Sequence, residues 1–456
     1  MTADKPIIVI GGGLAGCEAA WQLLQRGCRV VMYEMKPEVF SPAHKSPRLA
    51  ELVCSNSLRS NMQRNAAGLL KEEMRIMNSL ILEAADGTAV PAGKALSVDR
   101  VRFSIYVEEK LFSQERLAII RKELQEIPDD HVVIVATGPL TSSALAKSIA
   151  EKTGSAYLYF YDAISPIIEG DSIDHTRVFR ASRYGEGEGD YLNCPLEMME
   201  YDRLWKALTE GEDVPLKPFE EFKFFSGCLP IEILARSGKH TLAFGPMKPV
   251  GLLDPKTGKQ PYAVVQLRQE DEDGRLFNMV GFQTKLTWPE QRRILRMIPG
   301  LENAEFARYG SIHRNTFINS PALLSDTLQL RTNDSIYFAG QITGAEGYTE
   351  SSAIGLLAGL SAFHRACGHA MTPPPVTTAL GALLRYITHA DQINFQPMNI
   401  NFGIFPPLER KVPRKERGLH YAERSLTALR SWKKGQVSDF SLSPVAGENV
   451  VGTAEE

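Results

Sequence analysis

The sequence predicts an α/β protein built around a parallel sheet, and three features near its N-terminus lead to this prediction. The run "IIVI" at 7–10 is continuously apolar and β-branched, as in a parallel strand that is buried on both faces. A glycine-rich turn follows, and residues 14–27 then carry apolar side chains at helical spacing. The segment 29–34, "RVVMYE", returns as a second strand, so the pieces form a βαβ unit.

The turn between the first strand and the helix has the spacing G-x-G-x-x-G, with Gly11, Gly13 and Gly16. Gly11 permits the tight turn, Gly13 lets the backbone approach a pyrophosphate, and Gly16 lets the helix pack closely on the strand. The phosphates would then lie at the positive end of that helix. Glu34, at the end of the second strand, is placed to bond ribose hydroxyls. The sequence therefore predicts a dinucleotide site.

Two later segments also combine a buried strand with a glycine turn: "VIVATGP" at 133–139 and "IYFAGQITG" at 336–344. With the N-terminal turn, three strand ends converge on one extended ligand, which indicates FAD. Because one dinucleotide fingerprint is clear, we expect NADH or NADPH to act as a transient reductant. The predicted FAD-binding residues are Gly11, Gly12, Gly13, Leu14, Ala15, Gly16, Glu34, Thr137, Gly138, Gly340, Gln341, Gly344 and Tyr348.

These strands are far apart in the chain, so the regions between them are interpreted as insertions. The predicted fold is a Rossmann-like FAD-binding domain with an inserted α+β domain and a helical C-terminal part. A hairpin with a turn at Asp273 and Gly274 is expected in the insertion. The predicted divisions are the FAD-binding domain in two parts, 1–180 and 306–372, the inserted domain, 181–305, the helical basic segment, 373–435, and a tail expected to be disordered, 436–456.

Composition limits the classes of function. The 456 residues are 43% hydrophobic and 23% charged with a net charge of -3, which is ordinary for a soluble globular protein and shows no bulk attraction to nucleic acid. The six cysteines form no C-x-x-C pair and no metal-ligand spacing, so we expect reduced thiols in a cytoplasmic protein and no metal site. The apolar runs are too short for a signal peptide or a membrane span.

Two cysteines lie in unusual surroundings. Cys54 occurs in "ELVCSNSLRSN" and Cys228 in "FFSGCLPIE", where glycine and serine allow a substrate to approach the backbone closely. A thiol in such a turn is a candidate nucleophile. The alternative, a buried cysteine that acts as a small hydrophobic residue, stays open on these residues alone.

Several longer motifs occur together and in one order, and they carry a resemblance. They are "GGGLAGCEAA", "CSNSLRS", "NAAGLLKEEMR", "FFSGCLPIE", "FGPMKPVGL", "RYGSIHRNTFINSP", "GQITGAEGYTESSAIGLLAG" and "FQPMNINFGIFPPL". Over about residues 5–435 the chain resembles the folate- and FAD-dependent RNA (uracil-5-)-methyltransferases, whose main member makes ribothymidine in the tRNA T loop. A sister family that modifies wobble uridine shares the fold and the first fingerprint, but it is longer and its motifs around the cysteines differ.

The resemblance implies a reaction and residues for it. Methylenetetrahydrofolate would donate the carbon and reduced FAD the electrons. Cys228 would add to C6 of uracil, and Cys54 would be a second active-site thiol that either helps with the C5 proton or shields the flavin adduct. His313 matches the family's folate-stacking histidine, and Arg314 and Asn315 would orient the pterin or the flavin, although a structural hydrogen-bonding role is an equal alternative for these two.

An RNA substrate requires positive charge. Residues 409–434 carry nine Lys and Arg against three Glu, and Arg48, Arg59 and Arg64 flank Cys54. A solvated helix face is the alternative explanation for such a charge run. The predicted RNA-binding residues are Arg410, Lys411, Arg414, Lys415 and Arg417.

The function predicted from these observations is folate- and FAD-dependent methylation of uridine C5 in tRNA. Three other readings stay open at this point. The same chemistry could act on ribosomal RNA, the chain could be a small-molecule FAD-dependent oxidoreductase, or it could be a flavoprotein that binds RNA without catalysis. The oxidoreductase would need neither the two cysteine turns nor the basic segment.

Overall fold

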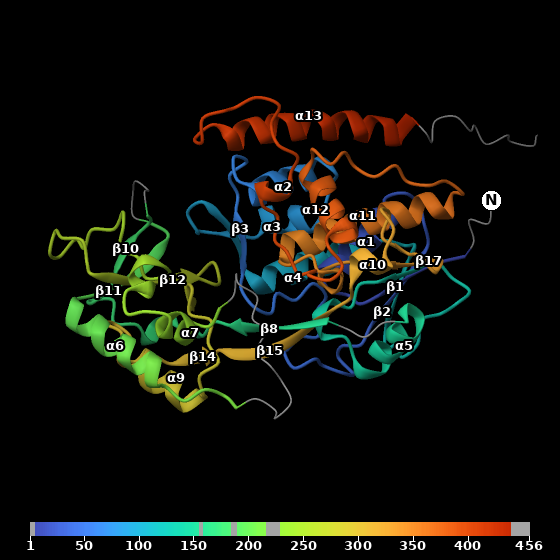
Figure 1. The fold of residues 1–456 in the computed structure, drawn as a ribbon. Helices are drawn as coiled ribbons and strands as arrows, with labels where there is room; N and C mark the ends of the chain where they lie inside the picture. The colour runs from blue at the N-terminus through green and yellow to red at the C-terminus, as the bar shows by residue number, and fades with distance from the viewer. Residues whose placement is uncertain (1–4, 155–157, 184–188, 216–228, 439–456) are drawn as a thin grey trace, which may run out of the picture.

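The structure is a computed structural model, and it describes residues 5–154, 158–183, 189–215 and 229–438. Two sheets lie side by side, and a long pair of strands runs between them (Figure 1). The helices of the N- and C-terminal parts gather over the first sheet, and a second group of helices lies against the other sheet.

The first sheet has six strands in the order β16-β17-β7-β1-β2-β6. The pairs from β17 to β6 are parallel, and β16 is antiparallel to β17. The three apolar segments predicted to share a sheet do so, which confirms the central part of the fold prediction. The strands are β1 (Ile7–Ile10), β2 (Val30–Glu34), β6 (Leu117–Arg121), β7 (Val133–Val135), β16 (Gln329–Leu330) and β17 (Asn333–Phe338).

Helices α1 (Leu14–Leu24) and α11 (Tyr348–Ala366) pack against each other at very close range. A Cβ atom added at Gly355 would lie 2.3 Å from the carbonyl oxygen of Ala15, and one at Gly359 would lie 2.7 Å from that of Ala19. Only glycine allows this approach, which brings the N-termini of both helices to the same edge of the sheet. The other helices of this part are α2 (Ala66–Ile76), α3 (Leu80–Gly87), α4 (Arg100–Phe112), α5 (Ser143–Thr153), α10 (Ser320–Leu323) and α12 (Ala379–His389).

The second sheet is antiparallel, with the order β10-β11-β12-β13-β9-β14. It has its own hydrophobic core beneath helices α6 (Met198–Glu210), α7 (Ile231–Arg236), α8 (Thr241–Phe244) and α9 (Trp288–Leu295). The predicted hairpin around Gly274 is confirmed. The strands are β9 (Ile167–Glu169), β10 (Phe179–Ala181), β11 (Tyr191–Leu196), β12 (Ala263–Gln269), β13 (Leu276–Met279) and β14 (Phe306–Arg308), so the sheet reaches beyond 181–305 on both sides.

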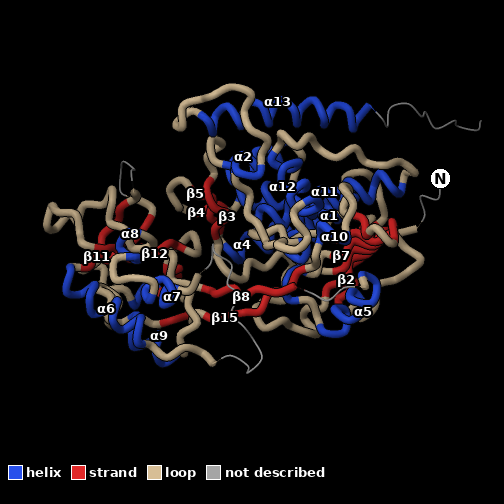
Figure 2. Tube along the Cα trace, viewed as in Figure 1, coloured by secondary structure: helices blue, strands red, loops and turns tan. Residues whose placement is uncertain are grey.

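Two smaller sets of strands lie between these sheets. The antiparallel pair β8 (Leu158–Ile164) and β15 (Ser311–Phe317) runs from one sheet to the other (Figure 2). A three-stranded sheet is formed by β3 (Ser57–Ser60), β4 (Ala89–Val90) and β5 (Ala95–Val98). Cys54 precedes β3 and His313 lies in β15, so both predicted site residues belong to this intermediate region.

The C-terminal part contains the short 3-10 helix η5 (Phe402–Ile404) and helix α13 (Arg417–Ser438), which lies across α2 (Figure 1). The buried Glu73 of α2 accepts hydrogen bonds from the amides of Ala379 and Leu380 at 2.7 and 2.9 Å and from the Ser425 hydroxyl of α13. One carboxylate thus fixes both C-terminal helices. Helix α13 extends past residue 435, and 439–456 lie outside the described residues. Within the described part of the chain, no helix is long and apolar enough to cross a membrane.

Candidate active site

The turn after β1 forms a cradle that side chains would fill. Gly11 has φ +104°, and a Cβ atom there would lie 2.6 Å from the carbonyl oxygen of Ala136. A Cβ atom at Gly16 would lie 1.8 Å from the carbonyl oxygen of Gly11. These contacts explain why the sequence has glycine at both positions, and they hold the start of α1 against the end of β1.

Gly13 is different, because a Cβ atom there would meet nothing within 4 Å. It is the N-cap of α1 and has φ -76°, which any L-residue adopts. The open space therefore lies directly over the positive end of an 11-residue helix, where phosphate groups bind favourably. This arrangement fits the pyrophosphate of a dinucleotide.

A cavity with about 1070 Å³ of empty space, part of it open to solvent, extends from this cradle along the carboxyl ends of β1, β2 and β7 to the start of α11. Parallel sheets of this type bind ligands at that edge. The volume of the cavity, and its extension along several strand ends, fit a long ligand such as FAD. The predicted FAD-binding residues that line the cavity are Gly11, Gly13, Leu14, Ala15, Glu34, Thr137, Gly138, Gln341 and Tyr348.

The other four predicted FAD-binding residues are glycines in packing contacts. A Cβ atom at Gly12 would lie 2.4 Å from Leu49, and one at Gly340 would lie 2.6 Å from Ala15. A Cβ atom at Gly344 would lie 2.6 Å from the ring of Phe395, and one at Gly16 would meet the carbonyl oxygen of Gly11. These glycines shape the wall of the cavity from behind.

Glu34 is held at the cavity by two backbone amides. Its carboxylate accepts hydrogen bonds from the amides of Gly12 at 2.8 Å and Lys36 at 3.0 Å. It lines the cavity, where carboxylate lone pairs also suit ribose hydroxyls. The ribose contact stays a prediction.

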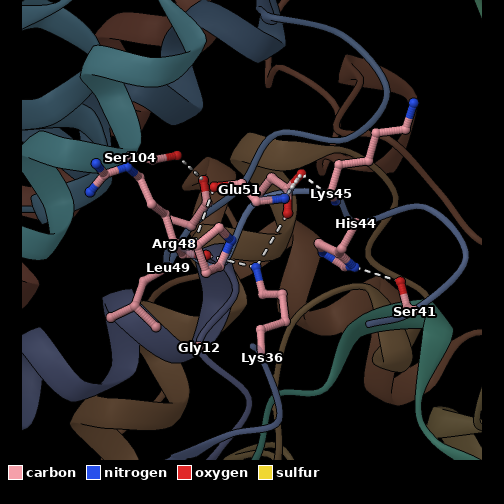
Figure 3. Close-up of polar contacts among 12 residues, drawn as sticks. Gly12, Lys36, Ser41, His44, Lys45, Arg48, Leu49, Glu51 and Ser104 are labelled. Atoms are coloured by element: carbon pink, nitrogen blue, oxygen red, sulfur yellow. Dashed lines mark hydrogen bonds and ion pairs between the residues drawn. The ribbon is translucent and has the colours of Figure 1, made fainter. Parts of the chain in front are cut away.

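Polar residues of the segment after β2 also line the cavity, and sequence reasoning missed them. Lys36 donates to the carbonyl oxygen of Arg48 at 2.7 Å and pairs with Glu51 at 3.3 Å, and Figure 3 shows Lys36 and Glu51 pointing toward one another. His44 lines the cavity beside them, and burial followed by the charge of Lys36 lowers its pKa. These residues belong to no motif, so only their position directly after Glu34 could have indicated them.

The backbone at Cys54 is attached to a residue of this cavity. The hydroxyl of Tyr348, at the start of α11, accepts hydrogen bonds from the amides of Cys54 at 2.7 Å and Ser55 at 3.1 Å. Burial raises the pKa of Tyr348 above its usual range, so its phenol stays neutral. Val53 also lines the cavity. The structure therefore brings the predicted second thiol to the rim of the predicted FAD site.

His313 lies in β15 and is half-buried. Its Nε2 is 3.0 Å from the Ser311 hydroxyl, and burial followed by the charge of Arg308 lowers its pKa, which favours the neutral ring. Asn315 is buried in the same strand, and Arg314 lies between them. Cys228, the predicted nucleophile, lies outside the described residues.

Comparisons with known proteins agree with this geometry. The family model described as glucose inhibited division protein A matches residues 6–370. Methylenetetrahydrofolate--tRNA-(uracil-5-)-methyltransferase TrmFO of Syntrophus aciditrophicus is 65% identical over 95% of this chain and 98% of its own length. The same enzyme of Geobacter sulfurreducens is 57% identical over 93% of this chain and 98% of its own. This chain belongs to the TrmFO family.

A solved structure shares the fold with this TrmFO-family chain. GidA of Aquifex aeolicus has a TM-score of 0.67 and 16% sequence identity, and the match covers 96% of this chain and 76% of that one. The predicted fold class, an FAD-binding type of α/β fold with a second domain and a helical C-terminal part, is confirmed.

A second hollow of this TrmFO-family chain is strongly basic. It contains about 1610 Å³ of empty space, open to solvent, and lies between β3, α2 and the start of α13. Three of the predicted RNA-binding residues line it, and Arg410 and Lys411 lie outside its lining. One lining cation is paired, since Arg59 lies 3.0 Å from Glu350. The lining cations are Arg59, Arg64, Arg414, Lys415 and Arg417.

We expect Gly13→Val to abolish FAD binding without unfolding the protein. Space for the valine is present and the backbone suits an L-residue, so the side chain would compete with the pyrophosphate alone. The check is the ratio of flavin to protein absorbance in the purified variant, together with its thermal unfolding midpoint. A variant that retains its full flavin content would show that the phosphates bind elsewhere.

Proposed function

We propose that this chain methylates C5 of a uridine in tRNA, with methylenetetrahydrofolate as carbon donor and NADH or NADPH as the source of electrons. The observation that carries the proposal is the contact between Cys54 and Tyr348, because it joins a thiol-bearing segment to the dinucleotide cavity. The names of three relatives that are 55–65% identical to this chain support this reaction. The reduced thiols of such an enzyme suit the cytoplasm.

The reaction needs a thiol because C5 of uracil is a poor nucleophile. A thiolate that adds to C6 converts C5 into an enolate-like carbon, which attacks the one-carbon unit. Loss of the C5 proton and elimination of the thiolate then restore the ring. The methylene carbon must gain two electrons and a proton to become a methyl group, and its bond to the folate nitrogen breaks, so that tetrahydrofolate leaves. FAD, once bound and reduced by NADH or NADPH, would supply the electrons.

Each proposed residue has a part in this reaction. Cys228 is the nucleophile that adds to C6, and Cys54 accepts the C5 proton. His313 stacks on the pterin; burial lowers its pKa and keeps the ring neutral, so stacking does not place a cation beside the cofactor. Glu34 and the N-terminus of α1 hold the ribose and the phosphates of FAD.

The basic hollow holds the RNA backbone in this proposal. Arg59 and Arg64 come from the segment that follows Cys54, and the other three cations lie at 414–417, just before and at the start of α13. RNA phosphates attract such a cluster, and a uridine must leave its stack to reach a thiol. A small-molecule oxidoreductase has no use for this hollow.

The nucleophile is tested with RNA that carries 5-fluorouridine at the target position. Fluorine cannot leave C5 as a proton does, so the enzyme with NADPH and methylenetetrahydrofolate should form a complex that survives denaturing gels. Peptide mapping should find the RNA on Cys228, and Cys228→Ala should keep its FAD while losing both trapping and methyl transfer.

A matched control is Cys367→Ala, because Cys367 is a partly exposed cysteine at the C-cap of α11, outside the lining of the dinucleotide cavity. It should trap RNA as the unmodified enzyme does. An adduct on Cys54 would exchange the two proposed roles, and full methyl transfer by Cys228→Ala would refute the nucleophile.

The basic hollow is tested by a triple charge reversal of Arg414, Lys415 and Arg417 to Glu. RNA affinity at low salt should fall about tenfold or more, with a shallower dependence on salt, because phosphate contacts release counterions. The FAD content should not change. Fluorescence anisotropy with labelled tRNA at several salt concentrations measures the RNA affinity and its dependence on salt.

The control for that variant reverses three cations in α6 and α9, which lie away from α13 (Figure 1): Arg203, Lys206 and Arg293. The charge change is identical, so only a general electrostatic effect would weaken RNA binding equally in both variants. Equal weakening, or no weakening in the first variant, would remove the hollow from the RNA site.

A further inference from the structure

Three arginine side chains from three different elements hold the segment that carries Cys54. Arg308, in β14, donates to the carbonyl oxygens of Val53 at 2.7 Å and Cys54 at 3.1 Å. Arg100, the first residue of α4, donates to the carbonyl oxygen of Leu52 at 2.6 Å. These hydrogen bonds fix the backbone of Cys54 and of the two residues before it.

The third arginine holds the other side of the segment. Arg268, in β12, donates to the Asn56 side-chain oxygen at 2.8 Å and to the Ser55 hydroxyl at 2.7 Å. Arg268 is 7% exposed, and Asn56 is fully buried. The residues on both sides of Cys54 are thus fixed by guanidinium groups, two of which belong to the second sheet.

The charges of this group do not balance. Arg100 pairs with Glu270 at 2.7 Å, whereas Arg268 and Arg308 donate to neutral oxygen atoms. Among the described residues, Glu270 is the one carboxylate bonded to the group. Arg308 also has a buried Nε that donates no hydrogen bond. Positive charge that is withdrawn from water without a counterion is costly, so the site favours an additional anion.

The Cys54 thiol is a candidate for that anion, because it interacts electrostatically with all three guanidinium groups. Burial is the largest influence on the pKa of each guanidinium and lowers it, and a charge on Cys54 acts on all three in the opposite direction. Electrostatic attraction between two groups is mutual. A thiolate at Cys54 stabilises the charged form of each arginine, and the three arginines therefore stabilise the thiolate.

We propose that Arg100, Arg268 and Arg308 form a guanidinium clamp that positions Cys54 and keeps its thiol in the thiolate form. The proton leaves to solvent, and no other reactant is required. Among the described residues the cations are in excess, because Tyr348 and His313 are neutral and Glu270, paired with Arg100, carries the one opposing charge bonded to the clamp. The described groups that interact electrostatically with Cys54 include Arg100, Arg268, Arg308 and Tyr348, and His313 interacts with Arg308.

The clamp gives the second thiol the protonation state that its proposed task needs. A base must be deprotonated before it accepts the C5 proton, and an ordinary cysteine with a pKa of about 8.5 is mostly protonated at neutral pH. This link to catalysis rests on the proposed function. The state of the thiol itself does not, and it can be measured without RNA or folate.

The experiment measures the rate of alkylation of Cys54 by iodoacetamide against pH in the full-length protein with its bound cofactor. Trypsin releases the thiol in the peptide 49–59, so mass spectrometry follows it separately from the other cysteines. We expect the midpoint of the pH profile to lie below about 8.5, and Arg308→Gln to raise it by about one pH unit. Arg308→Lys keeps the charge and should stay near the unmodified protein.

Arg296→Gln is the matched control. Arg296 also donates two hydrogen bonds to a backbone carbonyl, that of Ala304, in the same domain, and it touches none of the residues around Cys54. It should leave the midpoint unchanged. A purely structural clamp would change protein stability in Arg308→Gln without moving the midpoint.

An internal comparison applies even if Arg308→Gln fails to fold. Burial raises the pKa of Cys367, so at pH 7 Cys54 should react about tenfold faster than Cys367 in the same digest of the unmodified protein. A Cys54 midpoint at or above about 8.5, or equal rates for the two thiols, would overturn the proposal. A low midpoint in a protein that transfers no methyl group would refute the proposed function and leave the clamp intact.

Discussion

The segment 52–56 is held at once from the second sheet and from two helices of the first part, and the arrangement of the site depends on this constraint. Arg268 and Arg308 reach it from the second sheet, Arg100 reaches it from α4, and Tyr348 reaches it from the helix that begins at the dinucleotide cavity. Cys54 therefore has its position only when the two parts of the molecule are docked. Separation of the parts would also leave buried guanidinium groups without acceptors, which is costly.

The other side of the site depends on close backbone packing. Gly355 and Gly359 bring α11 onto α1, and this contact places the start of α11, with Tyr348, beside the turn that cradles the phosphates. The cavity and the thiol segment are thus coupled through one tyrosine. Helices α1 and α11, with the turn after β1, connect the proposed FAD site to Cys54, the proposed base.

Sequence reasoning succeeded where chemistry is encoded locally. The βαβ unit follows from an apolar run, three glycines and a helical period, all within 30 residues. It did not find β6, whose residues are partly or fully exposed. It could not find the clamp, because a single arginine in a strand such as Arg268 has no local signature. A basic RNA site was predicted from two charge groups that lie far apart in the chain. The fold shows which of their members line one hollow, among them Arg64 and Arg414.

The most direct test of the account follows one carbon atom. Purified enzyme is incubated with methylenetetrahydrofolate labelled on its methylene carbon, NADPH, and either unmodified tRNA or ribosomal RNA, and the nucleosides are separated by mass spectrometry. The account predicts label in 5-methyluridine from the T loop of tRNA and none in ribosomal RNA. NADPH oxidation that proceeds at the same rate without RNA and folate, with no label in either RNA, would contradict it.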